Sequence, residues 1–377
     1  MEIIHLVFTR NTKAKNNPIA DIANQLATEQ TKLGLKVSVW EISRRPSEQF
    51  QNKVYPFKHF SHHLFLWNSM KEIRRHLPGT GTGKLFHFHG GIMPVYYPIA
   101  FHLQENKIPF ILSPHGRYNS HTMEKASYLK KKHFENFDQN MISWSAALHF
   151  NSEYERKELF NIYPFNQQKT YICPNGLINN NLNIAPKIMK HDEIIYCFYG
   201  ELNIAAMGID ILLNGFAKFK KKHSNNAILW IIGNGPDRNN ILKSIKKLGL
   251  HKYVFVKPAV FGALKFEQLS KVDVIVRTPR VDFYPSVIME SAAMSIPCIV
   301  SGPTYITEII ASENAGYTIS ENNSDQLQKA FTESINDMET VQWNRKKMNA
   351  HQMVARHLNW TSIARTHIQV YQDIAGR

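Results

Sequence analysis

Two carboxylates, Asp282 and Glu290, lie eight positions apart on either side of a predicted turn into a helix. Pro285 or Ser286 suits the first turn of that helix, because proline has no N–H to lose there and serine can cap it. Free backbone N–H groups at a helix start attract anions such as a diphosphate. Glu290 could then accept hydrogen bonds from the vicinal hydroxyls of a ribose, and Asp282 from a sugar. The alternative is that both are ordinary solvated charges.

The elements around these acids predict a parallel sheet. Residues 273–276 form a short apolar run before Asp282, the helix is expected over 287–295, and 298–300 is a second apolar run. Buried parallel strands have this composition, and ligands bind at the carboxyl ends of such strands. The order strand, loop, helix, strand therefore places both acids at a binding edge.

The rest of the chain repeats this alternation. A strand is predicted at 3–8, a helix at 19–33 and a strand at 35–40. Residues 85–91 and 110–117 are strands that each end in His-Gly, and His87 and His89 share one face of their strand. The second half restarts at 194–200, and a buried strand at 228–236 ends in Gly-Asn-Gly-Pro. The sequence thus predicts an α/β fold with two domains.

The segment Asp282-x7-Glu290, followed by Ser-Ala-Ala-Met-Ser-Ile-Pro, resembles the E-x7-E signature of retaining glycosyltransferases of family 4. Ser-Pro-His-Gly at His115, Pro-Asn-Gly ending at Gly176 and the Gly-x-Gly-Pro loop at 233–236 extend the resemblance over nearly the whole chain. It implies the GT-B fold, in which two Rossmann-like domains face each other across a cleft. We expect an acceptor domain at 1–180, a donor domain at 181–355, and a C-terminal helix at 356–377 that crosses back to the first domain.

The resemblance also implies a reaction. A hexosyl or N-acetylhexosaminyl group would pass from a nucleotide sugar to a glycan or lipid-linked saccharide, with retention, in bacterial surface polysaccharide or lipopolysaccharide biosynthesis. His115 and Asp282 would orient the donor sugar, Glu290 would hold the ribose, and the helix start would stabilise the leaving diphosphate. No metal and no cofactor is expected. The remaining donor-binding positions are Ser286, Val287, Phe283, Tyr284, Gly233, Gly235 and Lys257.

Two positions depart from the family pattern. Glu201 and Met207 stand where the resemblance predicts an arginine and a lysine for the diphosphate. Charged hydrogen bonds of that kind contribute about 1.5–3 kcal/mol each. Three explanations stay open: another cation substitutes, the enzyme is inactive, or the protein only binds a sugar nucleotide, glycan or partner subunit. The candidate cations are Lys257, Lys13, Lys15 and Arg117, and the expected contacts from the first domain are Lys13, Arg117 and His89.

A further alternative function is that of a GT-B epimerase, which isomerises the donor without an acceptor. The Asp282 segment favours the transferases over it. Metal binding by His87, His89 and His115 is a second alternative, which the resemblance does not support.

Charge and composition limit the partners. The chain has 377 residues, 43% of them hydrophobic, and carries a formal net charge of +15. A positive field attracts phosphates on nucleotide sugars, nucleic acids or anionic membranes. No nucleic-acid-binding motif occurs, so no nucleic acid is expected. Lys130–Lys132 and the segment 62–76 suggest peripheral contact with an anionic membrane, although 62–76 also fits an ordinary surface helix.

Other features favour the cytoplasm. The three cysteines are widely spaced, which argues for a reducing compartment, and neither a signal peptide nor a membrane span is recognisable. Peripheral attachment would be at the inner membrane face. Near the C-terminus, apolar residues at helical spacing predict a packing stripe rather than a cofactor site: Trp360, Ile363, Ala364, Ile368 and Tyr371.

Overall fold

The computed structural model describes residues 1–9, 17–47, 50, 53–61, 66–80, 83–177, 193–223, 226–280, 282 and 285–376, with 66–69 described by backbone alone. Four predicted site positions, Lys13, Lys15, Phe283 and Tyr284, lie outside this part of the chain. So do residues 62–65 of the predicted surface helix. The chain divides into two compact units: unit 1 is Met1–Ile178 with Asn359–Arg377, and unit 2 is Asn179–Leu358.

Unit 1 is built on a parallel sheet of seven strands in the order β3-β2-β1-β4-β5-β6-β7. Placing β1 between β2 and β4 is the strand order of a doubly wound fold, in which ligands bind where the order reverses. The strands are β1 Glu2–Phe8, β2 Lys36–Ser43, β3 Phe57–Ser61, β4 Lys84–His89, β5 Phe110–Ser113, β6 Ala147–Phe150 and β7 Thr170–Ile172.

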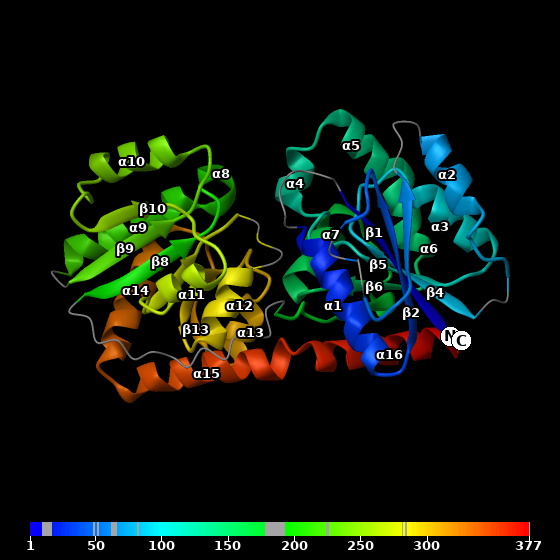
Figure 1. The fold of residues 1–377 in the computed structure, drawn as a ribbon. Coiled ribbons are helices and arrows are strands. Elements are labelled where there is room, and N and C mark those ends of the chain that lie inside the picture. Colours follow the sequence, from blue (N-terminus) through cyan, green and yellow to red (C-terminus); the bar gives the residue numbers. More distant parts are fainter. Residues whose placement is uncertain are drawn as a thin grey trace. The chain divides into compact units, whose positions relative to one another are not determined.

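Helices cover this sheet. The first, α1, begins after Asn17, whose side chain caps it by accepting from Ala20 N, and has Pro18 in its first turn. The last, α16, lies against α1 (Figure 1). The described helices of unit 1 are α1 Pro18–Lys32, α2 Leu66–Arg74, α3 Tyr96–Glu105, α4 Ser120–Glu124, α5 Tyr128–His133, a π-helical turn Phe134–Asp138, α6 Gln139–Trp144, α7 Glu153–Ile162, a 3₁₀ turn Gln167–Lys169 and α16 Trp360–Ala375.

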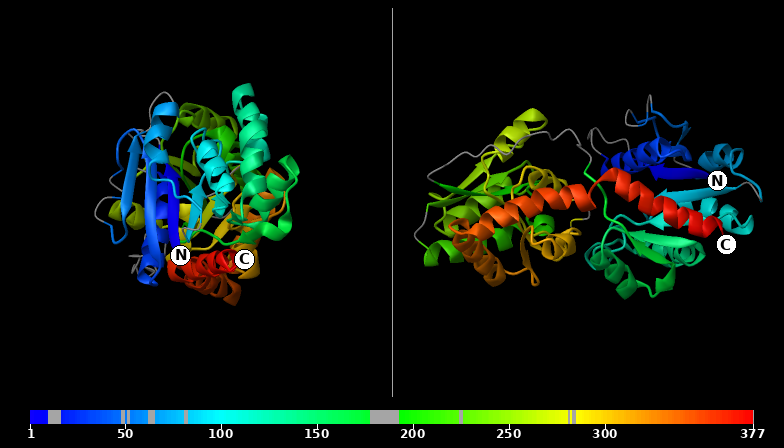
Figure 2. Two further views of the ribbon diagram at one scale, coloured as in Figure 1. Left: turned by 90° about the vertical axis from the view of Figure 1, so that its right-hand side faces the viewer. Right: turned by 90° about the horizontal axis from the view of Figure 1, so that it is seen from below.

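The helix α16 belongs to unit 1 although it follows unit 2 in the sequence. The Trp360 indole donates to Leu177 O at 2.9 Å, and its ring fills the space that a side chain at Gly176 would need. The predicted apolar stripe is buried except for Ile368, which is half-buried. β1 begins and α16 ends on the same side of unit 1 (Figure 2). The stripe therefore acts as a packing surface.

Unit 2 repeats the design with a parallel sheet of six strands in the order β10-β9-β8-β11-β12-β13. Its strands are β8 Ile194–Tyr199, β9 Ala227–Ile232, β10 Val254–Lys257, β11 Val274–Arg277, β12 Cys298–Ser301 and β13 Gly316–Ile319. Its helices are α8 Ile204–Met207, α9 Ile209–Lys222, α10 Arg238–Lys247, α11 Ala263–Leu269, α12 Ser286–Ala293, α13 Thr307–Ser312, α14 Ser324–Met338 and α15 Val341–His357.

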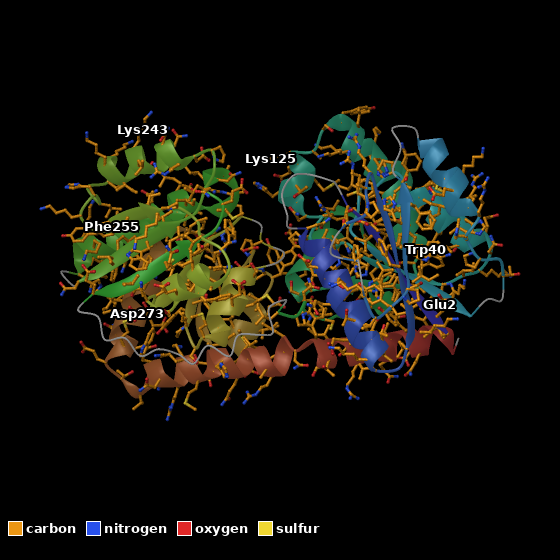
Figure 3. The ribbon with its side chains drawn as sticks, viewed as in Figure 1. Glu2, Trp40, Lys125, Lys243, Phe255 and Asp273 are labelled. Atoms are coloured by element: carbon orange, nitrogen blue, oxygen red, sulfur yellow. The ribbon has the colours of Figure 1, made fainter. Side chains whose placement is uncertain are left out.

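The interior of unit 2 is apolar. Aromatic residues from β8, α9 and α14 meet there, with the rings of Tyr196 and Phe331 perpendicular at 4.8 Å between centroids. Basic residues lie outside this core, and Lys243 projects from α10 into solvent (Figure 3). The three cysteines of the chain are buried and free.

The predicted α/β fold of two Rossmann-like domains is confirmed, and most predicted strands lie within a few residues of their expected positions. The helix expected over 287–295 runs from Ser286 to Ala293, and Pro285 precedes it as the capping residue. The edge strand β3 was not predicted, because residues 57–61 are not an apolar run.

Candidate active site

The carboxyl ends of β8 and β11 in unit 2 hold a buried arginine and acid. Arg277, the last residue of β11, donates through Nε at 3.2 Å and through Nη2 to the same carboxylate oxygen of Asp282. Its Nη1 donates to Tyr199 O at 3.2 Å. Both side chains are less than a tenth exposed. Among the described residues these contacts use three of the five guanidinium N–H groups, so two are left for a ligand.

Arg277 also lies directly over Gly200. A Cβ atom at Gly200 would come within 2.5 Å of Nη1, so this position accepts only glycine while the guanidinium is there. Gly200 immediately precedes Glu201, the first of the two positions that depart from the family pattern. A buried positive charge therefore occupies the turn where the sequence lacks one.

Glu290 is engaged by a residue that the sequence did not indicate. It lies in α12, is 5% exposed, and forms an ion pair through Oε2 with Lys265 of α11. The Lys265 ammonium also lies 5.4 Å from the centroid of the Tyr199 ring. The Glu290 carboxylate is therefore paired with a cation and held in one orientation.

The helix α12 begins beside these groups. Ser286 is half-buried at its first position, and Val287 is buried. The loop after β12 runs alongside, since Asp282 pairs with Thr304 as an isolated parallel bridge. The hydroxyl oxygens of Ser301 and Thr304 are buried here and have no hydrogen-bond partner among the described residues. Buried polar atoms of this kind call for water or a ligand.

The two glycines of the loop after β9 have a packing role. A Cβ at Gly233 would lie 1.9 Å from Gly200 O, and one at Gly235 would lie 2.6 Å from Leu202 O. The backbone is tied at the same place, since Leu202 N donates to Asn234 O at 3.0 Å. Close backbone packing between two loops explains both glycines, and their contact with a nucleotide stays a prediction.

The two departing positions differ in environment. Glu201 is exposed, whereas Met207 is half-buried and packs against the unit 2 core. Next to them, Arg280 donates to Ile204 O at 3.0 Å and forms an ion pair with Asp210 at 2.9 Å. This arginine therefore ties α8 and α9 to the loop after β11.

Lys257, the predicted substitute cation, lies at the end of β10. Its ammonium is 3.1 Å from the centroid of the Trp230 ring, and burial lowers the pKa of Lys257. The edge strand β10 is separated from β11 by β9 and β8. Arg277, at the end of β11, is therefore closer to Asp282 than Lys257 is, because two strands separate β10 from β11.

In unit 1, His115 follows β5 in a constrained turn. Its φ of 50° is in the left-handed region, where a residue other than glycine is strained, and Gly116 follows with φ 73°. Glu155 fixes this turn by accepting from Gly116 N at 2.6 Å and from Asn151 N at 2.7 Å. Arg117 is exposed beside it. This turn, held by Glu155, positions the imidazole at the carboxyl end of β5.

His115 contacts a buried row of polar side chains. Its Nε2 lies 3.1 Å from Nδ1 of His89, and the two rings stack. His87 and His89 share a face of β4, as predicted, with ring centroids 4.3 Å apart. The pKa of His115 is lowered to about 3, mainly by burial and then by the charges of His149 and Arg117. The imidazole is therefore neutral at pH 7.

Among the residues that the structure describes, two trios of side chains lie close enough to hold a metal ion: His5, His87 and His89, and His149, Cys173 and His367. In the first trio all six ring nitrogens already hydrogen-bond to protein groups. In the second, both nitrogens of His149 do so. The geometry therefore favours a hydrogen-bonded core at both places.

The sequence missed three residues that organise the site: Arg277, Lys265 and Glu155. In the sequence, Arg277 directly follows the apolar run 273–276. Its hydrogen bond to Tyr199 O joins residues that are 78 positions apart. Lys265 lies near other lysines in the sequence, and nothing in its pattern distinguishes it as the partner of Glu290. The sequence signal available for Glu155 was its position three residues after Ser152, which is the spacing of a helix capping box.

The chain matches two family descriptions. Residues 181–350 match "Glycosyl transferases group 1", and residues 20–178 match "Glycosyltransferase Family 4". The chain belongs to this family of glycosyltransferases, as the sequence resemblance predicted, and it is a transferase of sugars. None of the curated proteins matches its sequence.

Solved structures show the same fold at low identity. A glycosyltransferase from Rickettsia africae has a TM-score of 0.72 at 14% identity, covering 99% of this chain and 98% of its own. Anabaena Alr3699/HepE in complex with UDP and glucose has a TM-score of 0.70 at 12% identity, covering 99% and 100%. The lipopolysaccharide outer core galactosyltransferase WaaB gives 0.73 at 12% identity over the same shares. The fold is therefore GT-B.

No helix in the described part of the chain is long and apolar enough to span a membrane.

Proposed function

We propose that this protein transfers a hexosyl or N-acetylhexosaminyl group from a nucleotide sugar to a glycan or lipid-linked saccharide, with retention of configuration. The family and fold support sugar transfer. The Anabaena relative binds UDP and glucose, and WaaB acts in lipopolysaccharide synthesis. We place the reaction in the assembly of a bacterial surface polysaccharide or lipopolysaccharide, in the cytoplasm.

The observation that carries this proposal is the group at the carboxyl ends of the unit 2 strands. Arg277, Asp282, Glu290 and Lys265 gather there beside the start of α12, in the place where open α/β sheets bind ligands. The other carboxylate oxygen of Asp282 has no hydrogen bond from the described residues and would accept from a sugar hydroxyl. Glu290 would accept from the ribose, and Ser286 and Val287 would face the diphosphate.

Arg277 supplies the positive charge that positions 201 and 207 lack. Its guanidinium is buried, is held by Asp282 and Tyr199 O, and keeps two N–H groups for phosphate oxygens. Arginine suits this task because its planar donors match phosphate geometry. No metal and no cofactor enters this mechanism. The protein groups only bind, orient and neutralise charge while the acceptor hydroxyl attacks.

The test is a transfer assay with a panel of nucleotide sugars and lipid-linked saccharide acceptors. We expect nucleoside diphosphate release with at least one donor and an α-configured or β-configured product that matches the donor anomer by NMR. No transfer with any donor would contradict the proposal, and isomerised donor without acceptor would indicate the epimerase.

A second set of variants separates a relocated cation from lost chemistry. If Arg277 serves the diphosphate, Arg277→Met lowers kcat/KM by roughly 10- to 100-fold, the effect of one charged hydrogen-bonding group. Glu201→Arg then restores part of that loss in the double variant but adds little to the wild type. A large gain from Glu201→Arg and Met207→Lys in the wild type would instead show a catalytically impaired protein.

The helix α5 is the part of the described surface best suited to an anionic membrane face. Tyr128 and Leu129 are 72% and 78% exposed, and Lys130 and Lys132 beside them are exposed cations. Exposed apolar side chains next to lysines bind the interface of anionic lipid layers. The sequence indicated the lysines but not the two apolar residues.

Sedimentation with phosphatidylcholine vesicles, with and without phosphatidylglycerol, tests this surface. We expect binding only to the anionic vesicles at low salt, and its loss in Leu129→Ser and in Lys130→Glu. Lys243→Glu, on α10 of unit 2, is the matched control and should bind as the wild type does. Equal sedimentation of all three variants would rule out α5 as the contact.

A further inference from the structure

A single row of hydrogen bonds connects a backbone carbonyl in unit 1 to His115, and its direction can be worked out link by link. The carbonyl oxygen of Cys173 can only accept, so His149 must donate to it through Nε2 at 2.8 Å. Neutral His149 then has a bare Nδ1, which accepts from the Ser113 hydroxyl at 2.7 Å. The Ser113 oxygen in turn accepts from Nε2 of His87 at 2.6 Å.

The row continues through the C-terminal helix. Nδ1 of His87 is left as an acceptor, and the Tyr371 hydroxyl on α16 donates to it at 2.7 Å. The Tyr371 oxygen accepts from the amide nitrogen of Gln30 at 3.3 Å. This contact turns the Gln30 amide oxygen toward His5, whose Nε2 donates to it at 2.8 Å. The orientation of the Gln30 amide is thus set by its neighbours.

The last links end at His115. Nδ1 of His5 accepts from Nε2 of His89 at 2.9 Å, and Nδ1 of His89 accepts from Nε2 of His115 at 3.1 Å. Eight hydrogen bonds therefore all donate in one direction, from His115 toward Cys173. Nδ1 of His115 remains as a buried nitrogen without a hydrogen-bond partner among the described residues.

This direction of donation requires each imidazole to carry one proton. Burial lowers the pKa of His5 and of His149 to about 4, and that of His115 to about 3. Burial and the neighbouring imidazoles also lower the pKa of His87 and His89 well below the usual value. At pH 7 all five rings are neutral, so each has one donor and one acceptor nitrogen.

We propose that this row fixes His115 as the tautomer protonated on Nε2, so that Nδ1 presents only a lone pair to the ligand. The ligand group at this point must then donate a hydrogen bond, as a sugar hydroxyl or an amide N–H does. A carboxylate or phosphate oxygen would meet a lone pair and be rejected. The inference rests on the proposed function only for naming the donor group as a sugar hydroxyl. Gln30, Tyr371 and His149 are positioning residues that act through His115.

The tautomer can be read without any ligand. Long-range ¹H–¹⁵N spectra of protein labelled with ¹⁵N-histidine distinguish protonated from bare ring nitrogens, and loss of one spin system in His115→Asn assigns the residue. At pH 7 we expect His115 to carry its proton on Nε2. A proton on Nδ1, a mixture of tautomers or a doubly protonated ring in the wild type would overturn the proposal. Because no donor is present, this result is independent of whether the protein transfers sugar.

Two variants test whether the row sets that tautomer. Tyr371→Phe removes only a hydroxyl, frees the Gln30 amide to turn over, and should produce a mixture of His115 tautomers. Tyr171→Phe is the matched control, because it removes a hydroxyl that contacts His367 and no member of the row, and it should keep His115 protonated on Nε2. A tautomer unchanged in Tyr371→Phe, with the variant folded by circular dichroism, would show that the row does not control His115. An equal mixture of tautomers in Tyr171→Phe would show the same.

Discussion

The two sheets share one strand order around their centre but fill their interiors differently. In unit 1, polar side chains from β1, β4, β5 and β6 meet: His5, His87, His89, Ser113 and His149. In unit 2 the central strands β8 and β11 are lined by apolar residues, and the buried ion pair of Arg277 with Asp282 lies at the carboxyl end of β11. One architecture thus supports a polar core in one unit and an apolar core in the other.

The difference shows two ways to place a polar group at a strand end. In unit 2, ionised partners hold each other at the rim, where a charged ligand would arrive. In unit 1, a row of neutral polar side chains on one face of the sheet orients one imidazole without using charge. Neutral groups are the less costly choice in a deep interior, because burying an isolated charge there is far more unfavourable. The two units should therefore respond differently to acid and to substitution.

The largest expected effect is acid destabilisation of unit 1. An unfolded histidine has a pKa near 6.5, whereas burial lowers the pKa of His5 and His149 to about 4 in the folded protein. As pH falls from 6.5 toward 4, the unfolded chain binds protons that the folded chain cannot. The free energy of unfolding is thus fully retained above pH 6.5 and falls below it, by up to about 1.4 kcal/mol per pH unit for each such histidine.

Hydrogen exchange at pH 7 and pH 5, corrected for intrinsic rates, measures this difference within the full chain. Peptides from β1 and β4 should lose protection at pH 5, while those from β8 and β9 should keep it. The titratable groups around the histidine row include His5, His87, His89, His115, His149, His367, Tyr171, Tyr371, Cys173 and Arg117. Equal losses in both units would remove the distinction between the cores.

The second effect belongs to unit 2. Arg277→Met leaves Asp282 buried without its partner, and breaking a buried ion pair in this way costs about 3–5 kcal/mol. Chemical denaturation should show that loss. The double variant Arg277→Met with Asp282→Asn removes the unpaired charge as well and should recover most of it. If the single and double variants were equally unstable, the pair would have no energetic role.

The smallest effect concerns the glycines beside that pair. Gly233→Ala places a Cβ against Gly200 O and should lower the free energy of unfolding by about 1–3 kcal/mol, the usual cost of overpacking. Gly302→Ala in the same unit meets only one atom, at 3.9 Å, and should change stability by less than about 0.5 kcal/mol. Thermal melting of both variants compares them. An unperturbed Gly233→Ala would mean that the loops after β8 and β9 can separate.

The sequence predicts the fold well because each local pattern agrees with it. Apolar runs that stop at glycine or proline locate β5, β8 and β12, and helical spacing locates α16. His87 and His89 were expected on one face because side chains alternate along a strand. These features depend on near neighbours only.

What the sequence could not predict depends on distant partners. Gln30 and Tyr371 are 341 positions apart, yet they hydrogen-bond and join the histidine row to α16. Arg277 and Gly200 meet only because β11 pairs with β8. Spacing in the chain contains no signal for either contact. The roles predicted for Asp282, Glu290 and His115 remain predictions until a ligand is bound.

The central claim is that a nucleoside diphosphate binds at the carboxyl ends of the unit 2 strands. Calorimetric titration with UDP, GDP, ADP and CDP tests it on the wild type, on Arg277→Met and on the surface variant Lys243→Ala. We predict that at least one nucleotide binds the wild type and Lys243→Ala equally, and binds Arg277→Met about tenfold or more weakly. Binding to none of them, or equal binding to all three proteins, would contradict the account.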